Sequence, residues 1–251
     1  MTVPIEFLLV AGIVVVIVGI SKSGFAGGLG VIAVPVMTLY VSPQMALAIQ
    51  MPLLILMDFA NGWRYWKSWS RPVVMALLPG AFLGLAAGAA LFNVFDGVVL
   101  KALIGLMAVF MAAQFFLGGA KNGEQKIWRR PFIILAGFVS GFAGIVAHAG
   151  GPAVKGYLLS QNMDKTTFVG TNSMFFLFLN LVKGVIYGAM SQYTAETLQI
   201  SLMLIPFLVL GVFLGFRLHK LISQRVFQIL AFSLLGLAGV RLLVDVGLSV
   251  I

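Results

Sequence analysis

The sequence lacks cysteine entirely, and charged residues make up only 9% of its 251 positions. The absence of cysteine excludes disulfide bonds, a thiolate metal site and a cysteine nucleophile. In soluble domains roughly a quarter of the residues are charged. This chain therefore has too few charged residues to form a surface that faces water. Because 61% of the residues are hydrophobic, we expect an all-α polytopic protein whose partner is the lipid bilayer.

Acidic residues are scarce as well, with 7 Asp and Glu against 16 Lys and Arg. In a soluble protein such an excess suggests nucleic-acid binding, but here the basic residues lie mostly in short loops between apolar runs. Three loops hold ten of them: Arg64, Lys67 and Arg71; Lys121, Lys126, Arg129 and Arg130; Arg217, Lys220 and Arg225. Basic loops stay in the cytoplasm. The pattern predicts a multi-pass protein of the cell inner membrane that does not bind nucleic acid.

Ten apolar segments divide equally between two halves of the chain. They are 5–20, 28–41, 44–62, 73–92 and 98–118, then 131–147, 151–160, 165–188, 198–217 and 224–246. A membrane span takes roughly 20 apolar residues, so 28–41 is marginal and 151–160 is too short. We expect 5–41 and 131–160 each to form a glycine-broken hairpin that returns to its starting side. Each half then holds one hairpin and three transmembrane helices, giving 8–10 membrane segments. The first run has no basic leader or cleavage site, so we expect it to be mature structure.

The pentapeptide SGFAG occurs twice, beginning at Ser23 and at Ser140, an offset of 117. Two later pairs keep that offset, Pro35 with Pro152 and Tyr40 with Tyr157. This predicts two diverged repeats, 1–118 and 131–251, joined by a cytoplasmic linker, 119–130. The basic loops place the two SGFAG copies on opposite faces of the membrane, which predicts an inverted-topology repeat.

The glycine-rich breaks indicate a binding site. Irregular backbone inside hydrocarbon survives only where protein or a wet cavity surrounds it, and paired broken helices bind substrate near the midplane. Free helix N-termini there favour anions. The candidate glycines are Gly24, Gly27, Gly28 and Gly30 in the first copy and Gly141, Gly144, Gly150 and Gly151 in the second. The alternative is close helix packing through small residues, but two inverted copies favour a site.

Ionisable residues inside spans are expensive and usually functional. The candidates are Lys22, His148, Lys155 and Lys183, with Gln50 and either Thr171 or Asn172 as hydrogen-bonding partners. Their positive bias predicts an anionic ligand, and we expect no cofactor and no metal.

Each ionisable candidate also has a structural alternative. Lys183 can extend to the headgroups, Lys155 can be a charge at the cytoplasmic mouth, and Asp58 can pair with Arg64. His148 is either a proton carrier or part of a local hydrogen bond.

With these motifs the sequence resembles the TauE/SafE family, the sulfite exporter and toluenesulfonate uptake permeases. The resemblance covers essentially the whole chain and rests on the duplicated glycine words with their following prolines. It implies transport of sulfur-containing anions such as sulfite, sulfoacetate or aryl sulfonates, by cation-coupled or facilitated movement. The second copy reads HAGGPAVKGY where the first reads GVIAVPVMTLY, so any role of His148 or Lys155 rests on one half.

We therefore expect a sulfonate or sulfite carrier in which one repeat rocks on the other. The alternatives are an anion channel, an exporter of another small organic anion, or an assembly protein. An enzyme is not expected, because the sequence has no cysteine and its two histidines, His148 and His219, stand 71 positions apart.

Overall fold

The computed structural model describes residues 4–24, 30–92, 94–117, 128–218 and 223–250, and these ranges contain helices, turns and loops but no strand. The helices are α1 Ile5–Gly24, the 3-10 helix η1 Gly30–Ile32, α2 Ala33–Met37, α3 Pro43–Arg64, α4 Arg71–Phe92, α5 Gly97–Leu117, α6 Arg130–Ala147, α7 Gly151–Ser160, α8 Lys165–Ala189, α9 Ala195–Leu218 and α10 Gln224–Val250. Within these ranges eight helices are long and apolar enough to cross a membrane. The predicted all-α polytopic class is confirmed.

Local sequence explains where the two central helices begin. Ser42 precedes α3, and its side chain accepts a hydrogen bond from the backbone N–H of Met45, with Pro43 in the first helical position. Asp164 does the same for α8, accepting from the N–H groups of Thr166 and Thr167. Such caps satisfy N–H groups that have no partner within the helix.

The two predicted hairpins return to the end from which they start. In the first, the ring centroid of Phe7, at the start of α1, lies 6.4 Å from that of Tyr40, just after α2. In the second, Trp128 precedes α6 and its ring lies 5.8 Å from Tyr157, near the end of α7. The turn of the second hairpin begins at His148, whose left-handed φ of 53° ends α6. The turn of the first falls in 25–29, outside the described residues.

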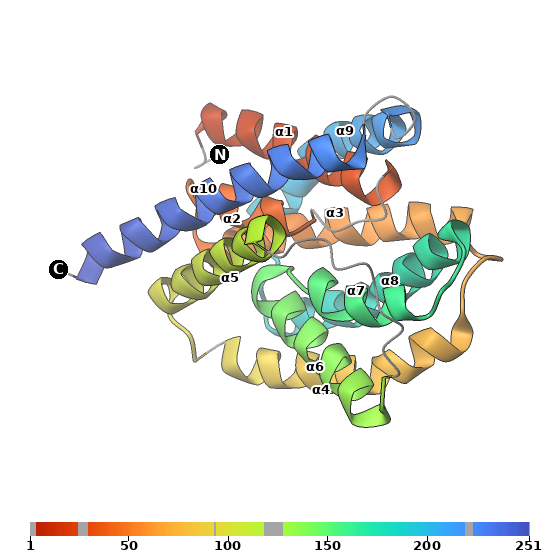
Figure 1. Ribbon diagram of the computed structural model, residues 1–251. Coiled ribbons are helices and arrows are strands. Elements are labelled where there is room, and N and C mark those ends of the chain that lie inside the picture. The colour runs from red at the N-terminus through yellow and green to blue at the C-terminus, as the bar shows by residue number, and fades with distance from the viewer. Residues whose placement is uncertain (1–3, 25–29, 93, 118–127, 219–222, 251) are drawn as a thin grey trace.

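Helices from different halves pack tightly against each other. Figure 1 shows α1 beside α9 along one side of the molecule and α4 beside α6 along the other, with α3, α7 and α8 between them. Glycines allow this approach, since a Cβ atom at Gly84 would lie 2.0 Å from the carbonyl oxygen of Phe138 on α6. Likewise a Cβ atom at Gly211 on α9 would lie 2.6 Å from the carbonyl oxygen of Val16 on α1. Small residues give membrane helices this kind of close contact.

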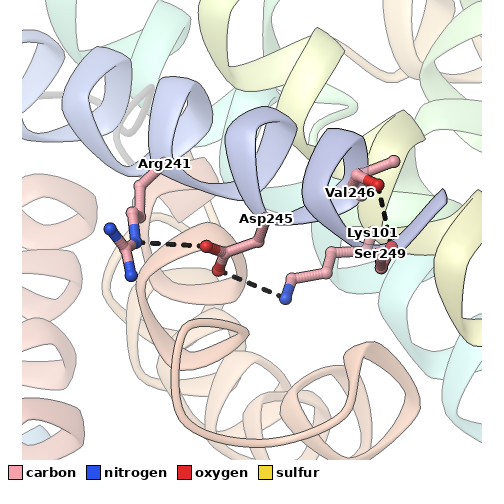
Figure 2. Close-up of polar contacts among 5 residues, drawn as sticks. All are labelled: Lys101, Arg241, Asp245, Val246 and Ser249. Atoms are coloured by element: carbon pink, nitrogen blue, oxygen red, sulfur yellow. Dashed lines mark hydrogen bonds and ion pairs between the residues drawn. The ribbon is translucent and has the colours of Figure 1, made fainter. Parts of the chain in front are cut away.

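The last helices of the two halves, α5 and α10, form a third such pair. The rings of Phe115 and Phe232 stack with centroids 4.3 Å apart. Towards the other end, Figure 2 shows Asp245 of α10 between Lys101 of α5 and Arg241 of α10, at 3.4 and 3.2 Å. The two helices are thus joined near both ends.

Candidate functional site

A largely buried ion pair joins α1 to α3. The Nζ atom of Lys22, near the end of α1, donates to Oδ1 of Asp58 on α3 at 2.5 Å. The other oxygen of Asp58 accepts from the Nδ2 atom of Asn180 on α8, also at 2.5 Å. Arg64 is not the partner of Asp58, because its guanidinium lies over the ring of Phe216, 5.0 Å from the centroid. One hairpin and both central helices therefore meet at a single carboxylate.

Lys183 lies one helical turn beyond Asn180 and is only 2% exposed. Its Nζ atom donates to the carbonyl oxygen of Gly144 at 3.2 Å, so the side chain does not extend towards the headgroups. The side chain stays buried because Lys183 lies on the face of α8 that points towards the end of α6. Asn180, one turn earlier on the same helix, binds Asp58, so Lys183 belongs to the same group. We call Lys22, Asp58, Asn180 and Lys183 the polar centre.

The turn of the second hairpin joins this centre through Tyr187 on α8. Its hydroxyl donates to the carbonyl oxygen of Ile145 at 2.6 Å and lies 3.5 Å from Nε2 of His148. The Nδ1 atom of His148 is buried and has no hydrogen-bond partner within the described part of the chain. Tyr187 follows Lys183 by one turn of α8, so its contact with His148 links the hairpin turn to the helix that carries Lys183.

Five further buried polar atoms have no hydrogen-bond partner among the described residues. They are the side-chain nitrogen and oxygen of Gln50, Oδ1 of Asn61, and the hydroxyl oxygens of Ser23 and Ser140. Gln50 is completely buried in α3. Buried polar groups are normally hydrogen-bonded, and each exception requires an explanation. A ligand-binding site gives such an explanation, because a bound ligand would supply the missing hydrogen-bond partners.

The sequence analysis missed Ser23, Asn61, Ser140, Asn180 and Tyr187. Two of them, Asn61 and Asn180, could have been found from the helix caps. The capping residues Ser42 and Asp164 stand 122 positions apart, and so do Asp58 and Asn180. On that register Gln50 corresponds to Asn172 and Asn61 to Lys183. The SGFAG offset of 117 does not extend past the hairpins, since the second half has five more residues between its SGFAG word and its cap.

The candidate glycines separate into two groups. Gly141 and Gly150 lie against backbone, since a Cβ atom would be 2.0 Å from the Ala81 carbonyl oxygen and 2.5 Å from that of Ser140, respectively. At these two positions glycine therefore permits close packing, as the alternative interpretation of the glycines predicts. A Cβ atom at Gly30 or Gly151 would meet nothing within 4 Å, and one at Gly144 only a Leu179 methyl at 3.8 Å. Gly24 ends α1, whereas Gly27 and Gly28 lie outside the described residues.

Two other candidates lie on α7 and α8. Lys155 is partly exposed on α7, and Asn172 is partly buried on the first half of α8. Thr171, the other candidate at that position, is fully buried and accepts a hydrogen bond from the backbone N–H of Ser70 at 2.9 Å. Thr171 therefore has a structural partner.

A cavity of about 300 Å³ lies apart from this centre, between α3 and α9. It is lined by Pro52, Leu53, Leu56, Leu198, Ser201, Leu202 and Ile205. Ser201 lies within hydrogen-bond distance of the carbonyl oxygens of Ile49 and Thr197, at 2.8 Å from each. The walls offer an anion no free donor, so the polar centre is the better candidate site.

Comparison with known proteins gives a consistent result. The chain matches the family model described as "Sulfite exporter TauE/SafE" over residues 11–242. It is also similar to a protein of Methanocaldococcus jannaschii described as a probable membrane transporter protein, at 24% identity over 95% of this chain and 97% of that one. No solved structure matches the chain significantly.

Proposed function

Because the chain belongs to the TauE/SafE sulfite exporter family of membrane transporters, we propose that it carries a sulfur-containing anion across the cell inner membrane. Organosulfonates such as toluenesulfonate, and sulfite itself, are the substrates that we have in view. The anion would lie between the two hairpins, beside α3 and α8. We do not propose an enzymatic activity.

The buried amine of Lys183 carries this proposal. Lys22 has Asp58 as its countercharge, but the hydrogen bond of Lys183 goes to the neutral carbonyl group of Gly144. No carboxylate lies within ion-pair distance of Lys183 in the part of the chain that the structure describes. A buried charge needs a partner of opposite sign, and a substrate anion supplies it.

The buried polar atoms without partners fit an oxoanion. Each sulfonate or sulfite oxygen accepts hydrogen bonds and donates none, so it needs donors such as the Nε2 amide of Gln50 and the hydroxyls of Ser23 and Ser140. These three are buried and lack partners among the described residues. We keep Gly24, Gly144, Gly151 and His148 as neighbours of the site, and Lys155 and Asn172 as candidates for the path from the cytoplasm.

The packing supports the proposed inverted repeat, 1–118 and 131–251, with a cytoplasmic linker at 119–130. A hairpin that returns to its starting side, followed by three spanning helices, makes each half end on the face opposite to its start. The second half then begins from the opposite face. Equivalent positions also make equivalent contacts: Pro79, Gly84 and Gly88 of α4 stand 127 positions before Pro206, Gly211 and Gly215 of α9. In both helices these glycines approach the hairpin helix of the other half.

We propose alternating access as the mechanism, with moving units drawn from both halves. The packing does not favour one whole repeat rocking on the other, because α1 contacts α9 and α4 contacts α6 through their backbones. Movement of an entire repeat would break both contacts. Movement of α1 with α9 against α4 with α6 would preserve them and would change the space around α3 and α8.

Ligand-induced thermal stabilisation of the purified protein tests the function. We expect sulfite, thiosulfate, sulfoacetate or toluenesulfonate to raise the melting temperature, and saturable, competable uptake in proteoliposomes. Lys183→Gln should weaken binding about 10- to 100-fold, because a hydrogen bond to a charged group contributes roughly 1.5–3 kcal/mol. Lys165→Gln, at the exposed start of the same helix, is the matched control and should bind normally.

Two results would contradict the proposal. If none of the four anions shifts the melting temperature, the chain does not bind this substrate class. If the reconstituted protein instead gives ohmic anion currents, it is a channel rather than a carrier.

A further inference from the structure

The charges in the polar centre do not balance when the site is empty. Lys22 and Asp58 neutralise each other across 2.5 Å, and Lys183, only 2% exposed, adds one positive charge in its ammonium form. Asn180 and Tyr187, one helical turn before and after Lys183 on α8, and His148 at the hairpin turn add no carboxylate to this group. With Lys183 protonated, the described centre therefore carries one net positive charge.

One monovalent anion removes this imbalance. With a sulfonate bound, Lys183 has a countercharge and the sum over the centre is zero. Without it, any occluded state between the outward-open and inward-open forms must enclose an unpaired ammonium away from water. Desolvating a single charge is far more costly than desolvating a neutral pair. The loaded carrier is therefore able to change its orientation, whereas the empty carrier is held back by its own charge.

From this charge count we infer that the protein is an anion exchanger. The substrate site changes the side of the membrane to which it opens only while an anion is bound, in both directions of the change. This inference rests on the function proposed above and adds the transport mode to it. Each cycle moves one anion inward and one outward, so the exchange of two monovalent anions moves no net charge.

A counterflow experiment with the full chain in proteoliposomes tests the exchange. Vesicles preloaded with unlabelled toluenesulfonate and vesicles containing only an impermeant zwitterionic buffer are both given labelled toluenesulfonate outside. We expect an initial uptake at least tenfold faster into the preloaded vesicles. We also expect retention of internal label when the outside holds no anion.

Two outcomes would overturn the inference while leaving the proposed function intact. Equal uptake into preloaded and buffer-filled vesicles would show that the empty carrier returns freely. Rapid uptake into buffer-filled vesicles on imposing an acidic outside pH would show that the empty centre is neutralised by loss of a proton from Lys183, and not by binding of a second anion. Absence of both binding and uptake would instead count against the proposed function itself.

Variants that change or preserve the net charge test its role directly. Lys183→Gln leaves the empty centre neutral. At saturating substrate, the initial rate of uptake into preloaded vesicles divided by the rate into buffer-filled vesicles should therefore fall to about one. The double variant Lys22→Gln with Asp58→Asn removes a neutral pair and keeps the excess charge, so its ratio should stay high. A ratio that falls equally in both would attribute the exchange to local structure and not to charge, and Lys165→Gln serves as the control for surface charge.

Discussion

At the scale of single residues, the feature that organises the centre is Asp58. One oxygen accepts from Lys22 and the other from Asn180, so the carboxylate joins the first hairpin to both central helices. Burying an ion pair gives little net stability, but removing one partner leaves the other charge buried and uncompensated. The pair therefore fixes where α1 ends relative to α3 and α8.

This arrangement predicts a non-additive pair of substitutions. Asp58→Ala should destabilise the protein by about 3–5 kcal/mol, because it leaves the Lys22 ammonium buried without its carboxylate. Combining it with Lys22→Met removes the stranded charge, so the double variant should be more stable than Asp58→Ala alone. Thermal unfolding in detergent measures both, and a double variant as unstable as the sum of the single ones would contradict the pairing.

At the scale of elements, the two halves begin their central helices with equivalent caps of different chemistry, Ser42 and Asp164. Hydrogen bonds from Thr167, first through its side chain and then through its backbone N–H, lower the pKa of the Asp164 carboxyl below its ordinary value of 3.8. The ionised form is therefore the better cap. Only the α8 cap should titrate, because the serine hydroxyl that caps α3 does not ionise in this range.

A pH series checks this difference. A lowered pKa in the folded state means that the stabilisation by ionised Asp164 is present above the unfolded pKa and is lost as the pH falls through the folded pKa. Asp164→Asn keeps a capping side chain but cannot titrate. The melting temperature of the native protein should exceed that of the variant at pH 7. The difference should shrink below the ordinary Asp pKa and vanish once the pH is below the folded pKa of Asp164. A constant difference would exclude the carboxylate as its source.

The close contact of α4 with α6 gives a second prediction at this scale. Gly84→Ala should destabilise the protein by about 1–3 kcal/mol or more, because the added methyl group would overpack the helix contact at 2.0 Å from the Phe138 carbonyl oxygen. The same substitution at Gly247 in α10, where a Cβ atom meets nothing within 4 Å, should be neutral or slightly stabilising. Comparison of the two melting temperatures separates a packing effect from a general effect of losing glycine.

At the scale of the whole molecule, the two halves interlock instead of lying side by side. Besides the pairs α1 with α9 and α4 with α6, α5 and α10 are joined by the Phe115–Phe232 stack near one end and by the Lys101–Asp245 ion pair towards the other. We therefore expect α5 and α10 to form a static unit during transport.

The absence of native cysteine makes this expectation directly testable. A Cβ atom at Gly236 would lie 3.1 Å from Cβ of Ala112, close to the separation of about 3.5–4.5 Å that a disulfide needs. Ala112→Cys with Gly236→Cys should form a disulfide on oxidation and keep its transport rate. A large loss of transport that a reductant reverses would show instead that α5 and α10 move against each other, as whole-repeat rocking requires.

The sequence alone determined the solvent and the helices. Apolar runs of span length form α-helices in hydrocarbon because every backbone polar group must be satisfied within the segment, so the expected 44–62 and 151–160 match α3 and α7 closely. The recurring Tyr40 and Tyr157 also marked the points where both hairpins return.

Only the tertiary structure decided how the polar residues are partnered. The sequence placed Asp58 near Arg64 and left Lys183 free to reach the headgroups, since neighbours along one helix are all that periodicity reveals. In the folded chain Asp58 meets Lys22 and Asn180, and Lys183 meets Gly144. These partners are far apart in sequence, and packing between helices, which no local pattern encodes, brings them together.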